Sequence, residues 1–115
     1  MLTIGIVGTR NPKITFEEVS KIIDDFNPTH IVSGGAKGID TFAENYAKLN
    51  KLPFTIFPPE YNKYGRIATF VRNQQIVDAS DMVIAFPTKD SKGTIDTIRR
   101  TKRSNKPLKV HQFNN

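Results

Sequence analysis

The chain has 115 residues, of which 37% are apolar, enough for one packed domain and too few for two. It has no cysteine and only two histidines, which excludes disulfides, thiolate catalysis and a typical zinc site. Seventeen Lys and Arg against eleven Asp and Glu give a net charge of +6, which favours nucleic acid or a phosphorylated small molecule as the partner. The apolar start lacks a basic leader and no apolar run has membrane-spanning length, so we expect a cytoplasmic protein with no membrane partner.

The first half of the chain alternates short apolar runs with amphipathic segments. Leu2 to Val7 is β-branched and apolar and predicts a buried strand, whereas Thr15 to Phe26 has helical apolar spacing, with Thr15 placed as its N-cap. His30 to Ser33 predicts a second strand. The apolar positions from Ile39 to Ala47 then predict a second helix.

The second half continues the same alternation. Pro53 to Phe57 predicts a third strand, and a loop through Tyr61 and Tyr64 leads to a helix from about Arg66 to Ala79. The remaining predicted elements are a strand at Asp81 to Phe86, a helix that opens within Thr88 to Thr94 and runs to about Ser104, and a strand at Leu108 to His111.

Strands that alternate with helices predict an α/β fold, because parallel neighbours need helical crossovers. We expect residues 1–115 to form a single Rossmann-like three-layer domain with a five-stranded parallel sheet of order 3-2-1-4-5. Such sheets bind ligands beyond the strand ends where the strand order reverses. The loops expected there are Gly8 to Lys13, Gly34 to Gly38 and Pro87 to Gly93.

The loop Ser33-Gly34-Gly35-Ala36-Lys37-Gly38 joins a predicted strand to a predicted helix that carries Asp40 in its first turn. Unpaired backbone N–H groups and the positive end of the helix dipole make such a junction an anion site. Glycines allow close approach of a phosphate, Ser33 can donate to it and Lys37 can supply charge. The alternative is a tight turn in which the glycines serve only geometry.

Two further loops and one helix face the same crevice in this prediction. Arg10 can bind phosphate in a bidentate manner or stack on a base, and a second helix N-terminus opens near Ser91. That helix start is equally consistent with a simple cap by Ser91 or Thr94. Tyr61 and Tyr64 suit base stacking or cover of the sheet edge. Besides the Ser33 to Gly38 loop and Asp40, the predicted ligand-binding set is Gly8, Thr9, Arg10, Arg72, Asn73, Phe86, Ser91, Lys92, Gly93 and Thr94.

Catalysis on an N-glycosidic bond would need a carboxylate to activate water or act as the nucleophile. The sequence offers Glu44, Glu60, Asp81 and Asp96, and none of these forms an obvious pair. Glu44 and Asp96 are the two catalytic candidates. No cofactor is expected.

Five blocks carry a resemblance to the SLOG superfamily of Rossmann-like domains, which includes DprA (Smf), the LOG phosphoribohydrolases and the small YspA-type proteins. In order, the blocks are Ile4 to Arg10, Ile31 to Asp40, Phe70 to Ser80 with Arg72-Asn73, Asp81 to Phe86, and Ser91 to Thr94. The chain length and the pattern of Tyr64-Gly65 followed by Arg72-Asn73 look closest to the YspA-type group. The resemblance implies binding of nucleotides or nucleotide-derived signals, and of single-stranded DNA in the DprA branch. The catalytic glutamate of the LOG motif falls on Thr97 here, with Asp96 adjacent.

Three functional hypotheses follow. The first is a domain that binds or senses a nucleotide-derived ligand, such as ADP-ribose, a cyclic derivative or a nucleoside phosphate. The second is an enzyme acting on N-glycosidic bonds, a phosphoribohydrolase or a deoxyribosyltransferase. The third is single-stranded DNA binding through Lys37, Arg72 and a basic last helix whose cations otherwise form a solvated face. We also expect a homo-oligomer, with the helix from Arg66 to Ala79 as the candidate interface.

Overall fold

The computed structural model describes residues 1–112 and contains a five-stranded parallel sheet of order β3-β2-β1-β4-β5. This confirms the predicted α/β class and the predicted strand order. The reversal of strand order lies between β1 and β4, which pair from Ile4 opposite Met82 to Gly8 opposite Phe86. The strands are β1 (Thr3–Gly8), β2 (His30–Ser33), β3 (Phe54–Ile56), β4 (Met82–Phe86) and β5 (Leu108–Val110).

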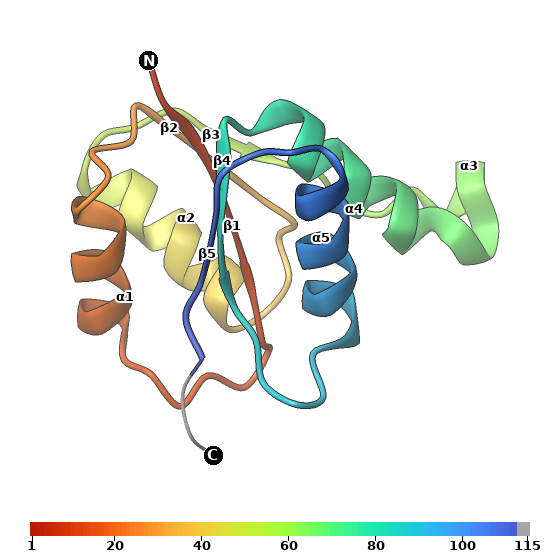
Figure 1. The fold of residues 1–115 in the computed structure, drawn as a ribbon, viewed down its shortest axis with the longest axis horizontal. Coiled ribbons are helices and arrows are strands. Elements are labelled where there is room, and N and C mark those ends of the chain that lie inside the picture. Colours follow the sequence, from red (N-terminus) through yellow and green to blue (C-terminus); the bar gives the residue numbers. More distant parts are fainter. Residues whose placement is uncertain (113–115) are drawn as a thin grey trace.

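Helices cover both faces of this sheet, as Figure 1 shows. The helices α1 (Phe16–Asp24) and α2 (Ile39–Leu49) cover one face, and α4 (Ala68–Ala79) and α5 (Lys92–Arg103) cover the other. The two faces follow from the alternation of side chains along each strand. Ile4 and Ile6 of β1 pack in a cluster with residues of α1 and α2, whereas Val7 packs with Ile76 of α4.

The first helix begins as the sequence predicts and ends earlier. The Thr15 side chain accepts from the backbone N–H of Glu18, and the Glu18 side chain accepts from Thr15, which forms a complete capping box. The helix ends at Asp24 rather than Phe26 because the chain turns there, and Asn27 adopts a positive φ of 49°.

The segment before α4 differs from the prediction of a loop followed by a helix from Arg66. Tyr61–Tyr64 forms a short helix, α3, and Gly65–Ile67 forms a 3-10 turn, η1, so that α4 begins at Ala68. Gly65 has φ of 59°, which a residue with a Cβ adopts only with strain, and it separates the two helical turns. In Figure 1 α3 projects away from the sheet beyond the start of α4.

None of the helices within residues 1–112 is long and apolar enough to cross a membrane.

Candidate functional site

A polar crevice of about 660 Å³ lies where the loops after β1 and β4 meet α4 and the start of α5. The two loops lie together at the lower edge of the molecule in Figure 1. The predicted residues that line the crevice are Gly8, Thr9, Arg10, Ala36, Asp40, Arg72, Asn73, Ser91, Lys92, Gly93 and Thr94. Those that do not line it are Ser33, Gly34, Gly35, Lys37, Gly38 and Phe86.

The N-terminus of α5 opens directly into this crevice. Ser91 occupies the N-cap position, but its side chain makes no capping hydrogen bond. Its Oγ instead accepts from the Thr88 N–H at 2.9 Å. A Cβ placed on Gly93 would meet no atom within 4 Å, so the first turn is unobstructed. The Lys92 N–H donates to the Asp90 carbonyl oxygen at 3.0 Å, whereas the N–H groups of Gly93 and Thr94 have no acceptor among residues 1–112. These two N–H groups and the positive dipole end make this helix start suitable for an anion.

Three hydroxyl groups connect the two sides of the crevice. Thr88 Oγ1 donates to Thr9 Oγ1 at 3.3 Å and lies 2.9 Å from Ser91 Oγ. Thr9 Oγ1 also accepts from the Asn11 N–H at 3.1 Å. This chain of hydroxyls fixes the loop after β1 to the loop after β4, and hydroxyls can also donate to phosphate oxygens.

The start of α2 is closed by the protein's own backbone. Ile39 N–H donates to the Thr9 carbonyl oxygen at 3.1 Å. Gly38 has φ of 78°, and a Cβ there would collide with the carbonyl oxygens of Thr9 and Arg10. Gly38 therefore permits the close approach of the loop after β1. At this position the glycine serves the geometry of the chain, which is the alternative to phosphate binding given above. In this loop, only Ala36 lines the crevice.

The Asp40 side chain, from the first turn of α2, hydrogen-bonds to the backbone of the loop that precedes this helix. Its Oδ2 accepts from the Ala36 N–H at 3.0 Å, and the side chain is almost completely buried. Burial raises the pKa of Asp40 above its usual range, opposed by the Ala36 N–H, by the charge of Arg72 and by the nearby Ser33 hydroxyl. Ser33 Oγ is itself buried and makes no hydrogen bond of good geometry with any of residues 1–112.

Arg72 and Asn73 line the crevice, and most of their side-chain polar atoms hydrogen-bond within the protein. Arg72 Nη1 donates to the Gly34 carbonyl oxygen at 3.0 Å, and its Nε donates to Asn73 Oδ1 at 3.0 Å. Asn73 Nδ2 donates to Gly93 O at 3.3 Å and to Asp96 Oδ2 at 3.0 Å. The pair thus connects the loop after β2 with the start of α5, and it positions the walls of the crevice.

The two candidate catalytic carboxylates lie outside the crevice lining. Glu44 pairs with Lys48 at 2.8 Å one turn along α2. Asp96 pairs with Arg100 at 2.7 Å and also accepts from Asn73. Both carboxylates are thus in ion pairs with a cation one helical turn further along. The described residues contain no cluster of three or more His, Asp or Glu side chains that would hold a metal.

Besides the apolar Val7 and Ile76, six polar lining residues were absent from the predicted set. They are Asn11, Lys13, Thr69, Asp90, Thr88 and Thr97. The predicted loops Gly8 to Lys13 and Pro87 to Gly93 already contained four of these six. Thr97 becomes visible only through the fold, because its Oγ1 donates to Gly93 O at 3.1 Å and this places it under the start of α5.

Comparison with known proteins places this chain in a family. The family model described as DNA recombination-mediator protein A matches residues 1–64, more than half of the chain, and the chain therefore belongs to that family. No curated protein sequence matches the chain significantly.

Two solved structures share the fold. DNA processing protein A (DprA) from Streptococcus pneumoniae matches with a TM-score of 0.79 and 24% identity, over 95% of this chain and 50% of that protein. DNA processing protein A from Helicobacter pylori, described for its single-stranded DNA binding mode, matches with a TM-score of 0.71 and 24% identity. That match covers 95% of this chain and 64% of the Helicobacter protein. The chain thus spans between half and two thirds of the length of these relatives.

Proposed function

We propose that this chain binds single-stranded DNA and that backbone phosphates enter the crevice at the start of α5. The observation that carries the proposal is the unobstructed, uncapped N-terminus of α5 opening into a crevice lined by Arg10, Lys13 and Lys92. A helix start supplies N–H donors and a partial positive charge, and the cations supply full charges.

The three cations are available for a ligand. Arg10, Lys13 and Lys92 are all exposed, and none forms an ion pair with another described residue. The carboxylate of Asp90, which also lines the crevice, offsets one of these charges. With a net charge of +6 on the whole chain, the long-range field favours approach of a polyanion.

The family supports DNA as the polyanion. The matched family is named for recombination mediation, and the Helicobacter relative of the same fold binds single-stranded DNA. Single strands leave their phosphates and bases free to follow a groove.

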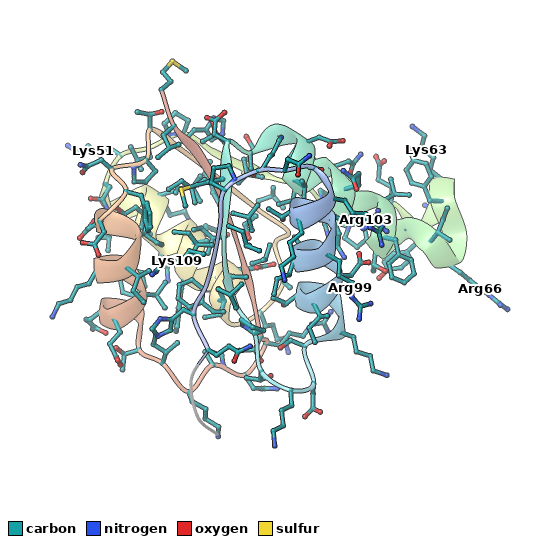
Figure 2. All side chains as sticks on the ribbon, in the orientation of Figure 1. Lys51, Lys63, Arg66, Arg99, Arg103 and Lys109 are labelled. Atoms are coloured by element: carbon teal, nitrogen blue, oxygen red, sulfur yellow. The ribbon has the colours of Figure 1, made fainter. Side chains whose placement is uncertain are left out.

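Fluorescence anisotropy with a labelled single-stranded oligonucleotide tests the proposal across a range of salt concentrations. Binding should weaken with salt. A plot of log K against the logarithm of the salt concentration should have a slope of about −0.7 for each phosphate contacted. Lys92→Gln and Arg10→Gln should each weaken binding and reduce that slope. Lys51→Gln is the matched control, because Lys51 is an exposed cation after α2, well away from α5 in Figure 2. Salt-independent binding, or equal loss in the control, would contradict the proposal.

A free nucleotide-derived ligand, such as ADP-ribose or a nucleoside phosphate, is the second candidate. The crevice volume of about 660 Å³ favours it, since small-molecule sites are typically about 300–1,000 Å³. Isothermal calorimetry separates the two functions. Tight binding of a mononucleotide that is unaffected by added oligonucleotide would favour the small ligand, and competition between them would assign one crevice to both.

A further inference from the structure

Two exposed apolar side chains lie at the end of β3. Ile56, the last residue of β3, is exposed by 42%, and Tyr61, the first residue of α3, is exposed by 60%. All strands of the sheet are parallel, so β3 ends at the same edge of the sheet as β1 and β4, whose following loops line the crevice. An aromatic ring exposed at this edge offers a flat apolar surface to a ligand.

The loop after β2 packs directly against Ile56. Ser33 lies opposite Ile56 in the paired strands, and the Phe57 N–H donates to the Ser33 carbonyl oxygen at 2.9 Å. A Cβ on Gly35 would come within 2.7 Å of Ile56 Cγ2, so the backbone of Gly35 approaches that side chain closely. Ala36, the next residue, lines the crevice. Ile56 therefore lies beside the loop that contributes to one wall of the crevice.

Arg72 connects the crevice with the surroundings of Tyr61. It lines the crevice from α4, and its Nη1 donates to the Gly34 carbonyl oxygen and lies 3.5 Å from the Phe57 carbonyl oxygen after β3. Burial lowers the pKa of Arg72, whereas the Asp40 carboxylate and the Tyr61 phenol counteract this shift. The phenol therefore lies near enough to the guanidinium to act on its charge. A ligand bound in the crevice can reach Tyr61 by passing Arg72.

We propose that Ile56 and Tyr61 form a nucleobase site beside the phosphate crevice, with one base of the bound single strand stacked on the Tyr61 ring. Each base presents a flat apolar face close to a charged phosphate, which matches an apolar surface close to a cationic crevice. The site tolerates different sequences, because every base has such a face. This inference rests on the proposed function and adds a contact to the part of the DNA that the crevice does not hold.

The charges near this surface favour a nucleic acid over an apolar protein segment. Lys37 in the loop after β2, Lys63 in α3 and Arg66 in η1 are exposed, and none forms an ion pair within residues 1–112. Lys63 and Arg66 lie at the projecting end of the molecule that α3 forms in Figure 2. Glu60, exposed just before α3, offsets one of these three charges. A single strand supplies phosphates for the cations and a base for the aromatic ring.

Fluorescence anisotropy with two oligonucleotides of equal length tests the base site. One is an oligothymidine, and the other is abasic, so that it keeps the phosphates and lacks the bases. Tyr61→Ala should weaken binding of the oligothymidine about 5- to 100-fold and change binding of the abasic strand by less than about 2-fold. Its salt dependence should keep the original slope, because no phosphate contact is lost.

Two further variants control for the loss of the ring. Tyr61→Phe keeps an aromatic ring and should retain most of the affinity for the oligothymidine. Leu49→Ala is the matched control and should bind as the original chain does, because Leu49 is an apolar side chain exposed by 71% at the end of α2. Circular dichroism shows whether each variant is folded.

A photo-crosslink locates the base directly. With iodouracil in the oligonucleotide, peptide mapping by mass spectrometry should place the adduct at Tyr61. An adduct only at residues outside β3 and α3 overturns the inference. Equal affinity of the original chain for the two oligonucleotides, or an equal loss for both in Tyr61→Ala, also overturns it and leaves phosphate binding in the crevice intact. If the original chain binds neither oligonucleotide, the proposed function fails and the base site fails with it.

Discussion

Arg72 Nη1 donates to the carbonyl oxygen of Gly34 at 3.0 Å, across 38 residues of sequence. The contact connects α4 to the loop after β2, and a weaker contact of 3.5 Å reaches Phe57 O beyond β3. Burial lowers the pKa of Arg72, whereas the Asp40 carboxylate counteracts that shift. The guanidinium therefore connects α4 with the loop after β2 and the chain after β3. Measurements of stability can test this structural role of Arg72.

Arg72→Lys should destabilise the fold by about 1–3 kcal/mol, because a single ammonium group cannot reproduce the several directed N–H bonds of the guanidinium. Urea unfolding followed by circular dichroism measures the change. Arg99→Lys is the control, since Arg99 is exposed on α5 in Figure 2 and should tolerate the exchange. If the Arg72 variant is as stable as the original chain, these hydrogen bonds contribute little to the free energy of unfolding.

Gly38 and Gly93 should respond differently to alanine. Gly38→Ala introduces a Cβ at φ of 78° and against the Thr9 carbonyl, so we expect a loss of more than about 1 kcal/mol. Gly93→Ala meets open space within α5 and should keep or raise stability by up to about 1 kcal/mol. Thermal unfolding of the two variants side by side measures the contrast. Similar losses at both positions would contradict the assignment of Gly38 to chain packing.

Asp40→Asn should change how stability depends on pH. Burial raises the folded-state pKa of Asp40 above its ordinary value of 3.8, so the folded protein favours the protonated carboxyl. That contribution to stability is fully present below pH 3.8 and is lost as pH rises through the raised pKa. The asparagine variant lacks this dependence, so its stability relative to the original chain should increase as pH rises above 3.8 and level off once pH exceeds the raised pKa. Midpoints of urea unfolding at a series of pH values measure the stability of both chains. A difference between the two chains that does not change with pH would contradict the prediction.

Thr88→Val removes the central hydroxyl of the chain that joins Thr9 to Ser91. Two hydrogen bonds are lost in a partly buried position, and we expect the free energy of unfolding to fall by about 0.5–1.5 kcal/mol. The loop after β4 should also become less ordered, which hydrogen exchange at residues 88–92 would detect. Thr41→Val, which removes a hydroxyl on the exposed side of α2, is the comparison. Unchanged hydrogen-exchange rates would mean that the hydrogen bond from the Thr88 N–H to Ser91 Oγ is enough to keep this loop ordered.

The sequence predicted the regular elements of this fold well where apolar spacing is clear. The apolar, β-branched run from Leu2 to Val7 and the capping signal at Thr15 both describe local preferences, and both are confirmed. It missed α3, because Tyr61–Tyr64 is one turn with no periodicity to detect. It predicted the crevice loops and placed Arg72 and Asn73 at the crevice, where both residues lie. The hydrogen bonds of Arg72 to Gly34 O and of Asn73 to Asp96 Oδ2 came only from the structure, since a sequence does not reveal which acceptors lie within reach.

The sequence by itself determined the parallel sheet, because alternating strands and helices require crossovers between parallel neighbours. The Rossmann-like pattern then predicted the strand order and the place where the loops meet. Only the tertiary structure decided which helix start is open to an anion. Backbone from Thr9 and Arg10 closes the start of α2, whereas nothing covers Gly93 at the start of α5. The two glycine-containing helix starts resemble each other in sequence, and they differ because contacts between distant segments decide which N–H groups remain free.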